Sequence, residues 1–148
     1  MEQAFREAEK AYEKKEIPIG AVLVFENKII GRGHNLTETL QDPTAHAEMI
    51  AITAASEYMG SKRLLNTAIY VTTEPCAMCA GAIVLARIKC LYYGTYDPKT
   101  GACGSVFDIP REPRLNHHVE VYAGLAADQA SRLLEQFFDR KRKEKQRN

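Results

Sequence analysis

Two short clusters of residues in the sequence could bind a metal and move a proton: His46-Ala47-Glu48 and Pro75-Cys76-Ala77-Met78-Cys79. Cys76 and Cys79 are three residues apart, so on a helix their sulfurs lie on one face and can bind a single ion. Each cluster falls near the start of a predicted helix, where partial positive charge favours the thiolate form of cysteine. The sequence therefore predicts a metal site with thiolate ligands.

The number of ligands distinguishes a catalytic zinc site from a structural one. A Cys-x-x-Cys pair also occurs in redox motifs and zinc ribbons, but this chain has no second pair, and the upstream partner of the right kind is His46. Structural zinc normally has four protein ligands, whereas catalytic zinc has three and leaves one position for water. We therefore predict one Zn²⁺ bound by His46, Cys76 and Cys79, with the pKa of its water lowered to about 7.

Glu48 is the predicted proton carrier of this site. It is two residues from His46, which on a regular helix is about 200° around the axis, but at a helix tip both side chains can project past the end. A carboxylate beside zinc-bound water can take its proton and deliver it to the substrate. The alternative is a surface glutamate in the first turn of a helix, which is a common feature.

The remaining cysteines and histidines offer a competing interpretation. Cys90 or Cys103 could complete a structural zinc site, although Cys90 alternates with apolar residues and is expected to be a small buried core residue. Cys103 lies in a loop, where it is either buried or exposed. His34 and the pair His117-His118 are expected to anchor loops or cap helices rather than to bind metal.

The hydrophobic pattern predicts strands interleaved with helices, which favours a sheet covered by helices on its faces. Asp42-Pro43 is a typical helix start, and Glu26-Asn27 is a typical tight turn between two strands. The expected helices cover residues 3–15, 43–58, 75–87 and 127 to the end, and the expected strands cover 21–25, 28–33, 68–72, 90–94 and 119–122.

Length and composition indicate one ordinary globular domain over residues 1–148, with 45% hydrophobic and 26% charged residues. No run of 18 apolar residues and no signal peptide is found, so we expect a cytoplasmic protein with no membrane partner and with reduced cysteines. Residues 140–148 contain six basic residues and one acidic residue, a net charge of +5. Such a tail fits contact with a polyanion such as nucleic acid, and the alternative is a solvated helix end.

The combination His-x-Glu and Pro-Cys-x-x-Cys is the signature of zinc nucleobase deaminases. Further motifs make the chain similar, over nearly its whole length, to the bacterial tRNA adenosine deaminases of the cytidine and deoxycytidylate deaminase superfamily. These motifs are Pro18-Ile-Gly-Ala-Val22, Gly33-His-Asn35, Asp97-Pro-Lys-Thr-Gly-Ala102, Gly104-Ser-Val106, Leu115-Asn-His117 and Phe137-Phe138 with the basic tail. Cys103 departs from the family pattern, in which a small inert residue is expected.

The resemblance implies a three-layer α/β/α fold with a mixed five-stranded sheet, and a homodimer whose interface helps to form the tRNA site. It implies hydrolytic deamination of adenosine to inosine at the wobble position of a tRNA anticodon, chiefly in an arginine tRNA. The zinc ligands would be His46, Cys76 and Cys79, and Glu48 would shuttle protons. Asn35 would hydrogen-bond the flipped base, and Asp97 would lie near its ribose.

Two alternatives share part of this pattern. A free-base deaminase acting on guanine or cytosine has the same zinc motifs but does not need a basic tail. A zinc-stabilised RNA-binding module without catalysis would have no need of Glu48 or of an open position on the metal.

Overall fold

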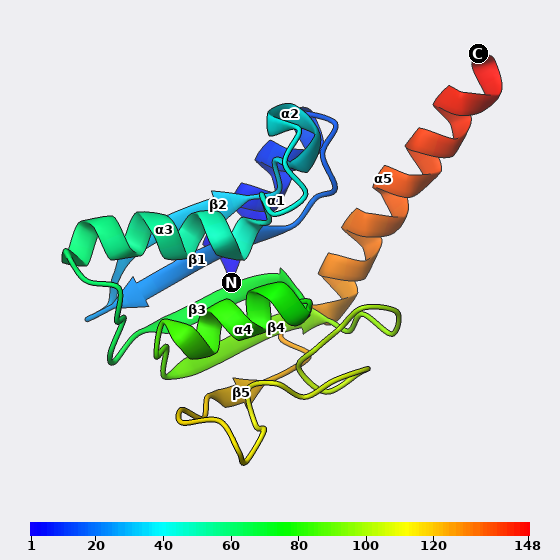
Figure 1. Cartoon of the computed structure of the whole chain (residues 1–148). Coiled ribbons are helices and arrows are strands. Elements are labelled where there is room, and N and C mark those ends of the chain that lie inside the picture. The colour runs from blue at the N-terminus through cyan, green and yellow to red at the C-terminus, as the bar shows by residue number, and fades with distance from the viewer.

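The structure is a computed structural model that describes residues 1–148. Its elements follow one another as the interleaved pattern predicts, except for a short additional helix over Thr37–Leu40 that was not predicted, and Figure 1 shows their arrangement. In chain order they are α1 (Glu2–Glu13), β1 (Gly20–Phe25), β2 (Lys28–His34), α2 (Thr37–Leu40), α3 (Ala47–Met59), β3 (Ala68–Thr73), α4 (Ala77–Leu85), β4 (Cys90–Thr95), β5 (Glu120–Tyr122) and α5 (Ala127–Arg147).

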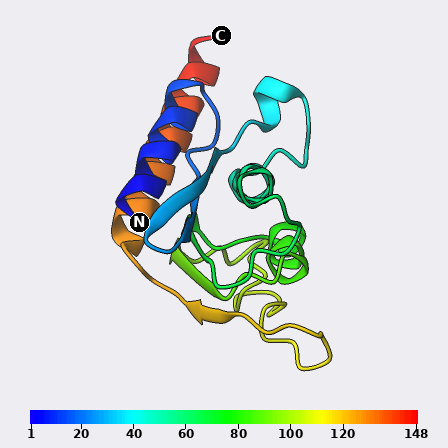
Figure 2. The same cartoon turned by 90° about the vertical axis from the view of Figure 1, so that its left-hand side faces the viewer.

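The five strands form one mixed sheet in the order β2-β1-β3-β4-β5. Strand β1 is antiparallel to β2 and β3, whereas β3, β4 and β5 are parallel to one another. Helices α1 and α5 lie side by side on one face of this sheet, and α3 and α4 cover the other face (Figure 2). The predicted three-layer fold with a mixed five-stranded sheet is therefore confirmed.

The main hydrophobic core lies between the sheet and the α3–α4 layer. Alternate residues of β3 and β4 contribute to it, namely Ile69, Val71, Leu91 and Tyr93, all of which are at most 1% exposed. This alternation is what a strand with one core-facing side requires. The core fixes the relative positions of β3, β4 and the two helices.

Two glycines allow α3 to lie directly against β2. A Cβ atom on Gly33 would lie 2.2 Å from the carbonyl oxygen of Ala47, and one on Gly31 would lie 2.3 Å from that of Ala51. Any side chain at these positions would push the helix off the strand. The helix presents small residues to this contact, since Ala47, Ala51 and Ala55 are fully buried. Glycine and alanine together therefore set where the N-terminus of α3 sits.

The predicted starts of two helices are wrong by a few residues. Asp42 does not open a helix; its carboxylate accepts hydrogen bonds from the backbone N–H and hydroxyl of Thr44, at 2.8 and 2.7 Å, and so closes a local turn. The short helix α2 precedes this turn, and α3 begins only at Ala47. Likewise α4 begins at Ala77 rather than at Pro75.

Two other predictions concern the turn between β1 and β2 and the burial of one cysteine. Glu26 and Asn27 both have positive φ, 50° and 61°, so the predicted tight turn between β1 and β2 is confirmed. Cys90 was expected in the core, and this is wrong. It is only partly buried and lies with Tyr92 on the side of β4 that faces away from the core residues Leu91 and Tyr93, and its thiol donates to Glu120 at 3.3 Å.

No helix of the chain combines the length and apolar character needed to cross a membrane.

Candidate active site and metal centre

The predicted metal ligands sit at the N-termini of α3 and α4. His46 and Cys76 are the N-cap residues of these helices, with extended backbone angles of φ −80°, ψ 153° and φ −74°, ψ 177°. A residue in this position projects its side chain past the helix end rather than from its flank. Cys79 follows in the first turn of α4. The site is thus built by two helix ends that face a common point.

The three predicted donor atoms lie close enough to bind one ion. The Nδ1 atom of His46 is 3.6 Å from the sulfur of Cys76 and 3.5 Å from the sulfur of Cys79. All three donor atoms lie within 4.8 Å of one another, and no other group of three His, Cys, Asp or Glu residues meets this criterion. An imidazole and two sulfurs at this spacing suit a tetrahedral Zn²⁺ with one remaining position.

The electrostatics of the donor set favour a cation at this point. Hydrogen bonding from Cys79 and from His46 lowers the pKa of Cys76 to about 4, so this thiolate is present at neutral pH. The contact with Cys76 also raises the pKa of His46 and of Cys79. A second thiolate beside the first requires a positive charge to compensate it. The chemistry of these residues therefore fits one Zn²⁺ per chain.

Glu48 lines a pocket of about 480 Å³ together with two of the three metal donors, His46 and Cys76. It is 4% exposed, and burial raises the pKa of its carboxyl, while contact with the Cys79 thiol opposes the shift. The interpretation of Glu48 as an ordinary surface glutamate is wrong, because its side chain is enclosed. A buried carboxyl beside the metal donors is suited to accept and return a proton.

Asn35 and Asp97 both line this pocket. Asn35 as a residue is 5% exposed, and its side-chain amide makes no hydrogen bond within the chain, so it is free to bond a ligand. The carboxylate of Asp97 instead accepts hydrogen bonds from Lys99 and Thr100, at 2.7–3.1 Å. Burial alone would raise the pKa of Asp97, but these hydrogen bonds outweigh burial and lower the pKa below its usual value. Its predicted role near a ribose stays a prediction.

Glu74 is a positioning residue that the sequence analysis did not identify. This buried carboxylate accepts hydrogen bonds from the backbone N–H groups of Asp97, Cys103 and Ser105, each at 3.1 Å, and from the Ser105 hydroxyl. Gly101 packs so tightly against it that an added Cβ would lie 2.3 Å from a carboxylate oxygen. The only signal in the sequence is a charged residue directly before Pro75, at the end of a buried strand.

The last helix also contributes to the pocket, which the sequence analysis did not predict. Leu134 and Phe138 of α5 line it, as do Tyr96 and the loop 97–100 after β4. Phe138 is 39% exposed, and Tyr96 is 57% exposed. The pocket therefore combines a polar, metal-binding floor with an aromatic rim.

The other histidines and cysteines lie outside the donor group. The Nε2 atoms of His117 and His118 lie 2.7 and 3.0 Å from the carbonyl oxygens of Ile88 and Glu112, so both rings anchor loops, as predicted. Cys103 is fully buried beside Pro75. Neither Cys90 nor Cys103 joins the three donors.

Comparison with known proteins agrees with this geometry. Residues 1–95 match the cytidine and deoxycytidylate deaminase zinc-binding region. A tRNA-specific adenosine deaminase of Bacillus subtilis (strain 168) is 47% identical over 145 residues, which are 98% of this chain and 90% of that protein. The chain belongs to the cytidine and deoxycytidylate deaminase family.

Solved structures of deaminases show the same fold. One, from a study of A-to-I editing by tRNA:A34 deaminases at the wobble position of transfer RNA, has a TM-score of 0.86 and 47% identity, and the match covers 90% of this chain and 96% of that one. The guanine deaminase of Bacillus subtilis has a TM-score of 0.63 and 30% identity, with coverage of 91% and 89%. The family predicted from the motifs is thus confirmed, and this deaminase is more similar to the first of these structures than to the second.

Proposed function

We propose that this deaminase converts adenosine to inosine at the wobble position of a tRNA anticodon, chiefly in an arginine tRNA. The observation that carries the proposal is the enclosed Glu48 beside three zinc donors, in a pocket large enough for a nucleoside. The 47% identity to a tRNA-specific adenosine deaminase over nearly the whole chain supports the substrate class. A tRNA substrate also agrees with the expected cytoplasmic location.

His46, Cys76 and Cys79 would hold the zinc, which would supply a Lewis acid that activates water at neutral pH. Hydrolysis adds the oxygen of one water at C6 of adenine and releases the amino group as ammonia. A proton must therefore move from that water to the ring nitrogen N1, and another to the leaving nitrogen. Glu48 carries both, because its buried carboxyl contacts the Cys79 thiol, whereas the other buried carboxylate of the pocket, Glu74, is already hydrogen-bonded to the loop after β4.

Asn35 selects and orients the base through its unpaired amide, which can donate to one base-edge atom and accept from another. The exposed aromatic rings of Tyr96 and Phe138 at the rim can stack on a nucleotide that has left its helical stack. An anticodon loop is already single-stranded, so presenting its adenosine costs a few kcal/mol or less by this route. The pocket is in this way suited to a base in a loop rather than in a duplex.

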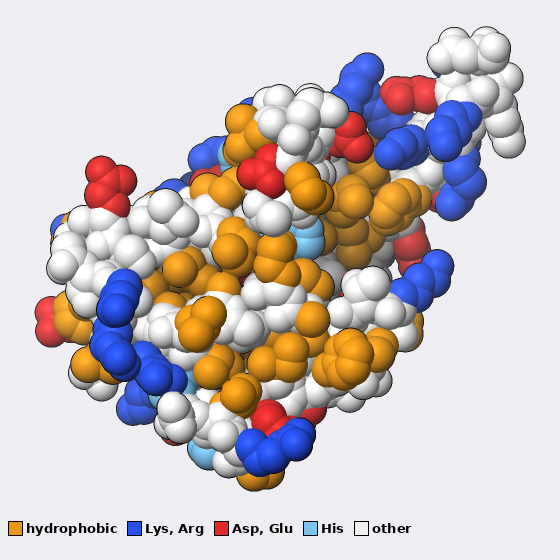
Figure 3. Space-filling model, in the orientation of Figure 1, with side chains coloured by type: hydrophobic (Ala, Val, Ile, Leu, Met, Phe, Trp, Pro, Cys, Tyr) orange, Lys and Arg blue, Asp and Glu red, His pale blue; other side chains and the backbone are white.

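We also propose that the deaminase is a homodimer that pairs through the outer face of the α3–α4 layer. Hydrophobic side chains gather over α3, α4 and the loop after β4, on the face that Figure 3 presents to the viewer. Leu85 of α4 is 79% exposed, and Val106 and Phe107 in that loop are 48% and 59% exposed. An apolar surface of this kind on a folded chain is typical of a protein interface.

The proposed reaction is tested by incubating the pure zinc-loaded protein with tRNA and sequencing the anticodon, because inosine is read as guanosine. The wobble adenosine of an arginine tRNA should change to guanosine in the readout, while adenosines elsewhere in the same molecule stay unchanged. Guanine, cytosine and cytidine serve as competing substrates in parallel reactions. Ammonia release from a free base, with no change in tRNA, would identify a free-base deaminase instead.

A further inference from the structure

A second cavity, of about 430 Å³, lies beside the active-site pocket between the end of α1, helix α2 and the middle of α5. The two cavities have α2 and α5 as common walls. Thr37 and Phe138 line the active-site pocket, whereas Thr39 and Phe137 line the second cavity. We call this cavity the basic groove; its lining residues are Tyr12, Lys14, Lys15, Glu38, Thr39, Phe137, Arg140, Lys141 and Glu144.

The basic groove holds four cationic side chains and two carboxylates. Arg140 is paired with Glu144 at 3.2 Å, and its guanidinium lies 5.6 Å from the centre of the Tyr12 ring. Lys14, Lys15 and Lys141 form no ion pair with any carboxylate of the chain. The groove therefore keeps an excess of unpaired positive charge, which attracts an anion.

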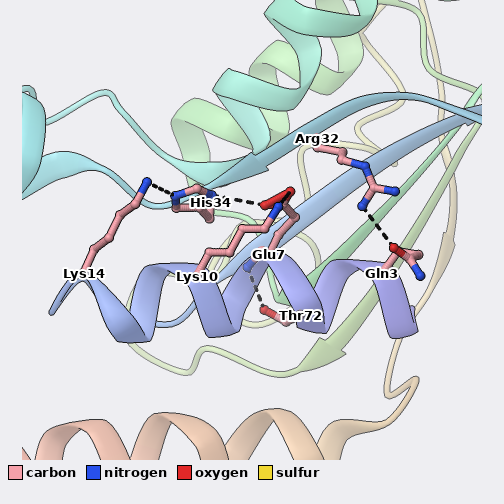
Figure 4. Close-up of polar contacts among 8 residues, drawn as sticks. Gln3, Glu7, Lys10, Lys14, Arg32, His34 and Thr72 are labelled. Carbon is pink, nitrogen blue, oxygen red and sulfur yellow. Dashed lines mark hydrogen bonds and ion pairs between the residues drawn. The ribbon is translucent and has the colours of Figure 1, made fainter.

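Lys14 is held in place by a relay of hydrogen bonds that begins inside α1 (Figure 4). Its ammonium is 3.0 Å from Nε2 of His34, and Nδ1 of His34 is 3.1 Å from a carboxylate oxygen of Glu7. An ammonium can only donate, so Nε2 accepts from Lys14 and Nδ1–H donates to Glu7. Glu7 is buried, and Lys10 binds its other oxygen at 3.0 Å. The position of Lys14 is thus fixed before any ligand arrives.

Lys15 and the opposite wall of the groove are fixed to each other. Lys15 has φ of 61°, in the left-handed region, and the next residue, Glu16, is 1% exposed. The carboxylate of Glu16 accepts hydrogen bonds from the backbone N–H groups of Glu38 and Thr39, at 3.3 and 2.6 Å, and from the Thr39 hydroxyl at 2.8 Å. The turn that carries Lys15 is therefore tied to α2. A groove built this rigidly loses little entropy when it binds a ligand.

We propose that the basic groove binds the RNA backbone at a phosphodiester linkage next to the nucleotide that occupies the active-site pocket. This inference rests on the proposed function, and it names the surface that holds the substrate strand. Lysine ammonium groups bind phosphate oxygens as point charges. Tyr12 and Phe137 offer aromatic surface beside them for the sugar or the neighbouring base, as in grooves that track a single strand. The common walls of the two cavities let one strand occupy both.

The test measures binding of an anticodon stem-loop RNA to Lys15→Ala and Lys141→Ala enzymes over a range of salt concentrations. Each variant should raise Kd about five- to tenfold and reduce the slope of log Kd against log salt by about 0.7, the value for one single-strand phosphate contact. The single-turnover rate of inosine formation at saturating RNA should not change, because the groove does not touch the reacting atoms. Zinc content and circular dichroism check that the variants fold.

Lys28 serves as the matched control. It begins β2 in the β1–β2 hairpin and does not line the groove. Lys28→Ala should leave Kd within about twofold of wild type, since this lysine lies away from the proposed phosphate contact. If the groove variants lose no more affinity than this control, the proposal is overturned.

Neutral methylphosphonate linkages then locate the contact. If one linkage beside the target adenosine lies in the groove, replacing it should remove most of the effect of Lys15→Ala, because both changes delete the same interaction. If the effect of the neutral linkage and the effect of Lys15→Ala simply add at every linkage, the proposal is overturned. It is also overturned if the groove variants lose as much affinity for a polyglutamate peptide as they lose for the RNA. A wild-type enzyme that binds the stem-loop but forms no inosine would refute the proposed function, while leaving the groove measurements valid.

Discussion

The chemistry of the site depends on where single residues fall relative to two helix ends. His46 and Cys76 are N-cap residues, so their side chains meet beyond the helices, and the positive ends of both dipoles face the metal position. Zn²⁺ held by two thiolates would be neutral, so this field would stabilise an additional negative charge at the site. One turn of difference in either helix would separate the donors.

Replacing Glu48 separates catalysis from binding. Glu48→Gln should lower the rate of inosine formation by about 10²–10⁴-fold, because the amide cannot carry a proton. Zinc content and RNA affinity should stay unchanged, since Glu48 is not among the metal donors. Glu57→Gln, at an exposed position of the same helix, is the control. If the Glu48 variant retains more than about a tenth of the wild-type rate, another group moves the proton.

We also predict that His46, Cys76 and Cys79 alone bind the zinc. Wild-type enzyme should contain one zinc per chain by elemental analysis, and so should Cys90→Ala and Cys103→Ala. His46→Ala should lose both zinc and activity, because two neighbouring sulfurs then lack a cation and a third donor. Loss of zinc from either of the first two variants would mean a four-ligand structural site and would contradict the catalytic interpretation.

At the scale of elements, the loop after β4 is shaped by a residue that precedes α4. Glu74 binds three backbone N–H groups of this loop, which in turn forms one wall of the pocket. The most distant of these hydrogen-bonded pairs, Glu74 and Ser105, is 31 positions apart in the sequence. No local pattern encodes such a contact, so sequence reasoning could not find it.

Glu74→Gln should loosen this loop. The amide presents a donor to backbone donors, so the free energy of unfolding should fall by about 2–4 kcal/mol. Hydrogen exchange at the backbone amides of Asp97, Cys103 and Ser105 should become faster, and the KM for RNA should rise. Glu9→Gln, an exposed position on α1, provides the comparison. Unchanged exchange at these three amides would show that the loop is held by other contacts.

The elements themselves were largely predictable, because strand alternation and helix periodicity reflect local burial. The failures were at two helix starts, at the short helix α2, which was not predicted, and at the burial of Cys90. Asp42 can cap a helix or close a turn with its own side chain, and only the packing of α3 on Gly31 and Gly33 decides between these. The zinc donors were predictable despite this error, because their chemistry depends on residue type and spacing. The contribution of α5 to the pocket depends on tertiary packing alone.

At the scale of the whole molecule, the two faces of the fold have different roles. The α1–α5 layer carries the basic groove, and α5 extends past the sheet with a net charge of +5 over residues 140–148 (Figure 1). The α3–α4 layer instead presents hydrophobic side chains to solvent (Figure 3). Both helices that hold the metal donors belong to this second layer. A partner chain bound there would therefore contact the same two helices whose N-termini carry the metal donors.

Leu85→Arg tests the proposed dimer. Leu85 is 79% exposed at the end of α4, and a charge there would be buried without a partner if two α3–α4 layers pair. Sedimentation should give twice the chain mass of 16.6 kDa for wild type and the single-chain mass for the variant. Because the interface is expected to help form the tRNA site, the variant should also bind tRNA more weakly while it keeps its zinc. Leu40→Arg, at a leucine that is 56% exposed on α2, should remain a dimer. A Leu85→Arg enzyme that sediments as wild type does would exclude this face as the interface.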